Sequence, residues 1–129
     1  MVPMCSKVYV TNECGVVATD PDLNRGIILT DDPYAGDVDC TFEIPAECNR
    51  IIGRFSSPVE MDELCYDYVS LISTYGSYEF ICNDDYISQY KLTEWHVFTN
   101  LEIDFYANST NPAGNKGFEF EWECMDPCK

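Results

Sequence analysis

The chain has 129 residues, enough for one domain with a buried core but too few for two. Its 23 acidic and 7 basic residues give a net charge of −16, which argues against nucleic acid and anionic membranes as partners and favours metal ions or a protein with a basic patch. Eight cysteines predict a disulfide framework, so we expect a secreted, extracellular protein. The sequence contains no run of about 18 apolar residues, so we expect no membrane insertion. We also expect a mature chain whose signal peptide has been removed.

The first half of the chain predicts short strands separated by turns. Cys40, Phe42 and Ile44 alternate with polar residues, so we expect these three side chains to face a core. Pro45 ends this strand, and residues 51–55 begin the next.

Residues 64–72 have apolar side chains at positions that fit either a helix or a strand. Aromatic and β-branched residues, followed by the polar run 73–77, favour a strand and a hairpin. Residues 78–82 predict a further short strand, and Asp84 and Asp85 begin a polar loop.

The last third of the chain predicts two strands. Residues 97–105 fit one long strand, and residues 117–123 alternate three inward aromatic residues with three outward glutamates. About eight short strands at this spacing, without a convincing helix, predict an all-β antiparallel sandwich.

Several segments together resemble CUB domains, the extracellular β-sandwich modules of complement proteases, receptors and spermadhesins. Glu60 stands five residues before Cys65, and the triplet Tyr-Asp-Tyr at 66–68 leads into an apolar strand, as in the most recognisable segment of that family. Further landmarks in the same order are the Cys-Gly pair at 14–15, the Gly-Ile pair at 26–27, the Asp-Asp-Pro-Tyr turn at 31–34, the strand at 40–44 and the Gly-Phe pair at 117–118. The resemblance implies a disulfide-stabilised sandwich of jelly-roll type, with an N-terminal extension at 1–13, a CUB domain at 14–124 and a cysteine-containing tail at 125–129.

The resemblance also implies two disulfides, Cys14 with Cys40 and Cys65 with Cys82. The remaining four cysteines allow three pairings, and we expect the two C-terminal cysteines to be joined to the other two rather than to each other. These four are Cys5, Cys48, Cys124 and Cys128. A zinc site is not expected, because the only histidine, His96, has no ligand pattern around it.

A calcium site at one end of the sandwich is a further implication of the resemblance. Its carboxylates would be Glu60 and Asp67, and a later loop would add Asn108, the carbonyl of Thr110 and Asn111. These are the oxygen ligands that calcium prefers. Asn108 stands where the family has aspartate, and the loss of this charge weakens calcium binding.

Two alternatives to the calcium site stay open. Asn108 begins the only Asn-X-Ser/Thr sequon, so a glycan on Asn108 would block the site. Alternatively, Glu60 and Asp67 are solvated or hydrogen-bonded carboxylates of a very acidic protein.

With calcium bound, the resemblance implies that the acidic side chains bind lysine or arginine of a partner protein. No nucleophile elbow or phosphate-binding glycine loop is present, and we expect no catalysis. The sequence therefore predicts a secreted, non-catalytic protein-binding module. One alternative is a calcium-independent secreted effector of spermadhesin or venom type that binds glycans or small ligands, and another is the regulatory module of a larger extracellular protease.

Overall fold

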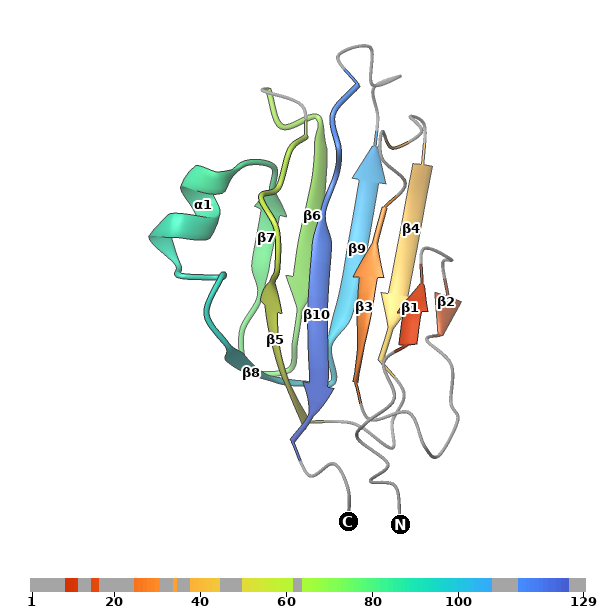
Figure 1. Ribbon diagram of the computed structural model, residues 1–129, viewed down its shortest axis with the longest axis vertical. Coiled ribbons are helices and arrows are strands. Elements are labelled where there is room, and N and C mark those ends of the chain that lie inside the picture. Colours follow the sequence, from red (N-terminus) through yellow and green to blue (C-terminus); the bar gives the residue numbers. More distant parts are fainter. Residues whose placement is uncertain are drawn as a thin grey trace.

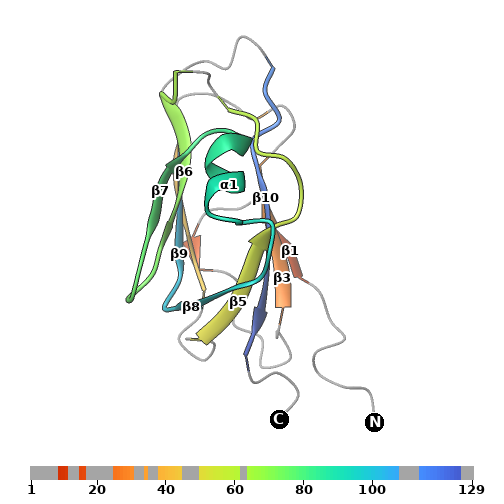
Figure 2. The same ribbon diagram turned by 90° about the vertical axis from the view of Figure 1, so that its left-hand side faces the viewer.

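The computed structural model describes residues 25–30, 34, 38–44, 50–61, 64–107 and 114–125, together with the backbone of residues 9–11 and 15–16. Over these residues the chain forms two five-stranded sheets packed face to face, seen face on in Figure 1 and edge on in Figure 2. This architecture confirms the predicted antiparallel sandwich.

Sheet A contains both the first and the last described strands. Its order is β1 (Tyr9–Thr11), β3 (Arg25–Leu29), β10 (Glu119–Cys124), β5 (Arg50–Phe55) and β8 (His96–Thr99). Sheet B has the order β2 (Gly15–Val16), β4 (Val38–Glu43), β9 (Glu102–Ala107), β6 (Asp67–Ile72) and β7 (Tyr78–Ile81). Only the edge pairs β1–β3 and β2–β4 are parallel among the described strands.

The core lies between the sheets and is filled by alternating aromatic and aliphatic residues. Phe118 contacts Phe55 of sheet A and Phe42 and Phe105 of sheet B, with ring centroids 5.7 to 6.4 Å apart. The predicted inward positions of β4 and of the last strand are confirmed, since their apolar side chains are buried. Burial of each large apolar side chain stabilises the fold by about 1.5 to 3 kcal/mol.

The prediction of one long strand at 97–105 is wrong. β8 ends at Thr99 in sheet A and β9 begins at Glu102 in sheet B, so the chain crosses between the sheets here. Asn100 makes the turn with a left-handed backbone (φ 55°), a conformation that asparagine tolerates better than most residues. Its side chain donates a 3.2 Å hydrogen bond to Thr74 Oγ1 on the neighbouring hairpin.

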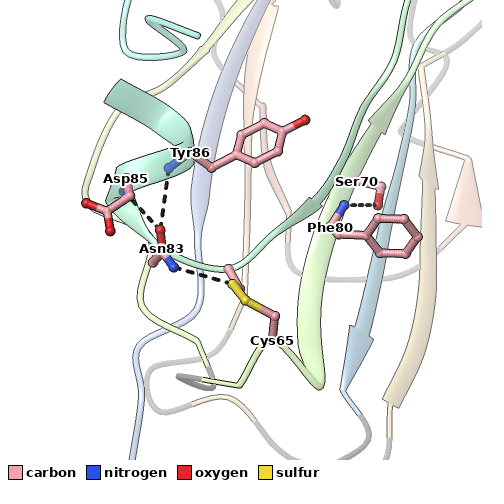
Figure 3. Close-up of a disulfide and its surroundings, with 7 residues drawn as sticks. Cys65, Ser70, Phe80, Asn83, Asp85 and Tyr86 are labelled. Carbon is pink, nitrogen blue, oxygen red and sulfur yellow. Dashed lines mark hydrogen bonds between the residues drawn. A yellow bond between two sulfur atoms is a disulfide. The ribbon is translucent and has the colours of Figure 1, made fainter. Parts of the chain in front are cut away.

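A short helix, α1 (Asp84–Gln89), replaces the polar loop that the sequence predicts. Asn83 is its N-cap, and Asn83 Oδ1 accepts hydrogen bonds from the backbone N–H groups of Asp85 (2.9 Å) and Tyr86 (3.4 Å) (Figure 3). Ile87 anchors the helix because its side chain is buried. Figure 2 shows that α1 lies at the open edge between the two sheets.

Candidate functional site

Asp67 is a buried carboxylate at the first position of β6. Its side chain is 0% exposed, and Oδ2 accepts a 2.5 Å hydrogen bond from the hydroxyl of Tyr34. The ring of Tyr34 is buried too and packs edge-on against Phe105, with centroids 5.4 Å apart. Because an unpaired buried charge is very costly, this hydrogen bond helps to keep the carboxylate inside the sandwich and fixes its orientation.

The strand register brings three chain segments to the level of Asp67. Ala107, the last residue of β9, pairs with Asp67 on one side and with Val38 on the other. Asn108 follows Ala107 directly in the sequence, so the segment that contains the other predicted ligands continues from this end of the sheet. Asn108, Thr110 and Asn111 themselves lie outside the described residues.

Glu60 lies in a segment whose backbone is hydrogen-bonded to Gly117 and to Asp84 of α1. Its N–H group donates to Gly117 O (3.0 Å), and its carbonyl accepts from Gly117 N–H (2.8 Å), in an isolated β-bridge. The neighbouring Val59 N–H group donates a 3.0 Å hydrogen bond to Asp84 Oδ1 of α1. The side chain of Glu60 is 46% exposed, and its Oε2 is 3.6 Å from Lys116 Nζ, an exposed contact that contributes little to stability. The backbone is therefore fixed while the carboxylate stays accessible.

A disulfide and a backbone hydrogen bond connect the segments of Glu60 and Asp67 through Cys82. Cys65 is bonded to Cys82, as the resemblance implies, with a Cα–Cα distance of 5.4 Å (Figure 3). The carbonyl of Cys82 accepts a 3.2 Å hydrogen bond from Met61 N–H, one residue after Glu60. One residue separates Cys65 from Asp67, so both carboxylates are tied to one cross-linked end of the sandwich.

The other predicted disulfides are described only in part. Cys40 and Cys124 are both disulfide-bonded, and their partners lie outside the described residues. Cys5, Cys14, Cys48 and Cys128 also lie outside them, so the pairing of these cysteines stays a prediction.

Glu60 and Asp67 are the two predicted calcium ligands that the structure describes. Across the described part of the chain, no group of three or more histidine, cysteine, aspartate or glutamate side chains is close enough to hold a metal. The two carboxylates supply the oxygen chemistry that calcium requires, but the rest of the predicted set and the sequon at Asn108 belong to the segment that is not described. The calcium site and the glycan both stay predictions.

Sequence reasoning missed two contacts at this end. Tyr34 was identified only as a turn residue, although its hydroxyl binds a carboxylate 33 positions away. Asp84 was assigned to a loop, although it fixes the segment before Glu60. Neither contact leaves a local signal, because both depend on the packing of distant segments.

His96 packs against aromatic side chains at the edge of sheet A. Its ring contacts Tyr78 and Phe98, with centroids 5.9 and 6.4 Å apart, and Nε2 is 2.9 Å from the carbonyl of Lys91. Over the described residues, no helix has the length and apolar character needed to cross a membrane.

Comparison with known proteins finds similarity in structure but not in sequence. No protein-family profile and no curated protein matches the chain. The CUB1-EGF-CUB2 domains of rat MASP-1 match with 15% identity and a TM-score of 0.63, over 89% of this chain and 41% of that one. The corresponding human MASP-1/3 structure matches with 16% identity and a TM-score of 0.66, over 91% and 44%.

A single-domain structure matches over nearly its whole length. The crystal structure of the MASP-1 CUB2 domain bound to Ca²⁺ matches with 12% identity and a TM-score of 0.58. The match covers 89% of this chain and 96% of that one. The chain therefore spans less than half of each three-domain fragment but almost all of one CUB domain. At these identities the likeness shows the fold alone.

Proposed function

We propose that this chain, whose fold is CUB-like, is a secreted, non-catalytic recognition module that binds basic side chains of a partner protein through a calcium-organised acidic site. Glu60 and Asp67 would contribute carboxylates to the site, and Asn108, Thr110 and Asn111 would complete it from the following loop. The calcium ion would hold the acidic side chains in one orientation, and a lysine or arginine of the partner would then form charge-assisted hydrogen bonds with them.

The observation that carries this proposal is the environment of Asp67. A carboxylate that is 0% exposed at a strand end is costly unless compensating groups surround it, and Tyr34 is one such group. A divalent cation supplied from the same end of the sandwich would add to this compensation. The Ca²⁺-bound MASP-1 CUB2 domain, which shares the fold, also supports the proposal.

The charge of the chain gives this proposal a sharp test. We suggest measuring the affinity of a fluorescein-labelled hexa-lysine peptide with millimolar calcium and with chelator, at constant ionic strength. Bound calcium adds positive charge to the protein, so electrostatic attraction alone predicts weaker peptide binding. An organised site predicts the opposite, a gain of about fivefold or more with calcium, as is typical of coupled sites.

Glu60→Gln is the most informative variant, because this side chain is exposed and the backbone bridge to Gly117 does not need its carboxylate. We expect Glu60→Gln to lose the calcium-dependent gain. Glu94→Gln removes the same charge from an exposed residue elsewhere and should keep the gain. Unchanged or weaker binding of hexa-lysine by the wild-type protein in calcium would contradict the proposal.

A further inference from the structure

The outward side of sheet B carries a cluster of aromatic rings. On β6, Val69 and Leu71 are buried in the core, so the alternation of the strand places Tyr68 on the opposite side. Tyr106 pairs with Tyr68 across the sheet, and their ring centroids are 5.4 Å apart. Phe80 of β7 packs against the same tyrosine, with ring centroids 4.9 Å apart.

Phe80 is held in this cluster by an irregular backbone. Its φ is 60°, in the left-handed region that costs a residue with a side chain about 1 kcal/mol or more. The β6–β7 register shifts here, and Phe80 N–H donates a 3.1 Å hydrogen bond to Ser70 Oγ instead of to a strand carbonyl (Figure 3). The ring is nevertheless 59% exposed. The chain therefore accepts an unfavourable backbone conformation while leaving a large apolar side chain in contact with water.

Acidic side chains surround this cluster. Asp39 pairs with Tyr106 across β4 and β9, and Asp104 lies two residues before Tyr106 on the same side. Glu102 lies two residues before Asp104 on the same strand and pairs with Glu43. Burial and the adjacent carboxylates of Asp104 and Glu43 raise the pKa of Glu102, which shows that these acids crowd one another.

No cation offsets these acids from within the sheet. None of the five described strands of sheet B contains lysine or arginine, whereas β3 and β5 of sheet A contain Arg25, Arg50 and Arg54. Figure 2 shows the outer side of sheet B facing away from sheet A, with α1 at the edge between the sheets rather than over this side. The aromatic rings and the acids thus share the outer side of sheet B, and the described strands of that sheet bring no lysine or arginine to it.

We propose that this face docks an arginine-bearing segment of a partner protein. The face is defined by the rings of Tyr68, Phe80 and Tyr106 and the carboxylates of Asp39, Glu102 and Asp104. A guanidinium group stacks on aromatic faces and donates two parallel hydrogen bonds to a carboxylate, so one arginine uses both kinds of side chain present here. A second copy of this chain would bring the same acids and be repelled, as would nucleic acid or an anionic membrane. Tyr68 directly follows the proposed ligand Asp67, but the two side chains lie on opposite sides of sheet B, and the proposed docking of arginine does not require calcium.

Preference for arginine over lysine is the property that tests this inference. Fluorescein-labelled hexa-arginine and hexa-lysine peptides are titrated with the wild-type protein in chelator. The net charge attracts both peptides alike, whereas stacking on the rings favours arginine, and we expect hexa-arginine to bind about fivefold more tightly. Because calcium is absent, this result does not depend on the proposed calcium site.

Phe80→Asn removes the ring without adding strain, because asparagine tolerates the left-handed backbone. This variant should lose most of the preference for hexa-arginine and keep its affinity for hexa-lysine. Tyr75→Ser removes a ring that is 88% exposed on the β6–β7 hairpin and should keep the preference. Equal affinities of the two peptides for the wild-type protein, or an unchanged preference in Phe80→Asn, would overturn the proposal.

A charge-matched pair of double variants separates this face from the field of the whole protein. Glu102→Gln/Asp104→Asn removes two acids from sheet B, and Glu119→Gln/Glu123→Gln removes two from the outer side of sheet A. We expect the first pair to weaken hexa-arginine binding about fivefold more than the second, the range for partly desolvated charge pairs. Equal losses would show only general attraction, and dimers in sedimentation at low salt would show that a second copy covers the face; either result overturns the proposal.

Discussion

The hydroxyl of Tyr34 donates a 2.5 Å hydrogen bond to Oδ2 of Asp67, and both side chains are buried. This contact ties Tyr34, four positions before the start of β4, to the first residue of β6, the strand that lies between β9 and β7 in sheet B. It therefore links the stability of the sandwich to the orientation of a proposed calcium ligand.

Tyr34→Phe tests the energetic weight of this contact. The variant keeps the ring that packs on Phe105 but removes a donor to a buried carboxylate oxygen. We expect the free energy of unfolding to fall by about 2 kcal/mol, measured by urea denaturation at neutral pH. Tyr75→Phe removes the hydroxyl of a tyrosine that is 88% exposed and should leave the stability unchanged. If the two variants unfold alike, the Tyr34 hydroxyl does not stabilise the fold.

Gly117→Ala tests the bridge that holds Glu60. Gly117 has a left-handed backbone (φ 91°), and an added methyl group would overlap with Thr30 Oγ1 and lie 2.9 Å from Thr30 Cβ. Thr30 has little freedom to move, because Oγ1 donates to Lys116 O (3.1 Å) and accepts from Phe118 N–H (3.2 Å). We expect a loss of about 3 kcal/mol in the free energy of unfolding from strain and overlap together.

Gly114→Ala is the matched control for this variant. Gly114 also has a positive φ (69°), but no atom lies within 4 Å of an added methyl group. We expect it to cost about 1 kcal/mol, the strain contribution alone. Equal losses at the two glycines in urea denaturation would show that the contact with Thr30 is unimportant.

Glu102→Gln tests the crowding of acids on sheet B. Burial, followed by Asp104 and Glu43, raises the pKa of Glu102 in the folded protein, so ionisation of this group favours unfolding. The contribution of Glu102 to stability is therefore full below the unfolded pKa and is lost as the pH rises through the folded pKa. We expect the variant to unfold at a higher urea concentration than the wild type at pH 7, with a difference that disappears below about pH 4.

Glu123→Gln provides the comparison on sheet A, where Glu123 pairs with Arg25 across the strands. Removing that acid also removes an opposite charge, so no stabilisation at pH 7 is expected. A Glu102→Gln protein that is no more stable than the wild type at pH 7 would contradict the account of crowded acids.

Phe80 provides a test of backbone strain that does not involve binding. Phe80→Asn and Phe80→Ala both remove the ring, but only asparagine suits the left-handed backbone. We expect the asparagine variant to be more stable than the alanine variant by about 1 kcal/mol, measured by thermal unfolding. Coincident melting curves would show that no strain is held at this position.

Sequence reasoning predicted those parts of the fold in which alternation and burial agree. Phe120 and Trp122 face the core as their spacing indicates, because β10 is regular and central. The break at Asn100 was missed because apolar side chains continue on both sides of the crossing, with Phe98 and Leu101 both buried. The helix α1 was missed because six residues are too few to show a helical period.

The candidate site could be predicted only as far as the resemblance extended. It identified Glu60, Asp67 and the cysteine pair beside them, but the donor from Tyr34 depends on tertiary packing. The aromatic face was missed for another reason. Regular alternation places Phe80 on the side opposite Ile81 but gives no sign of the irregular backbone that exposes its ring against Tyr68.

The central claim is that calcium organises the acidic end of the sandwich, and thermal unfolding in calcium and in chelator tests it most directly. At a calcium concentration one hundred times the dissociation constant, binding should stabilise the folded protein by about 2.7 kcal/mol, a rise in melting temperature of roughly 5 to 20 °C for a domain of this size. We predict this rise for non-glycosylated wild-type protein and its loss in Glu60→Gln. Superimposed melting curves of the wild-type protein in the two buffers would contradict the claim.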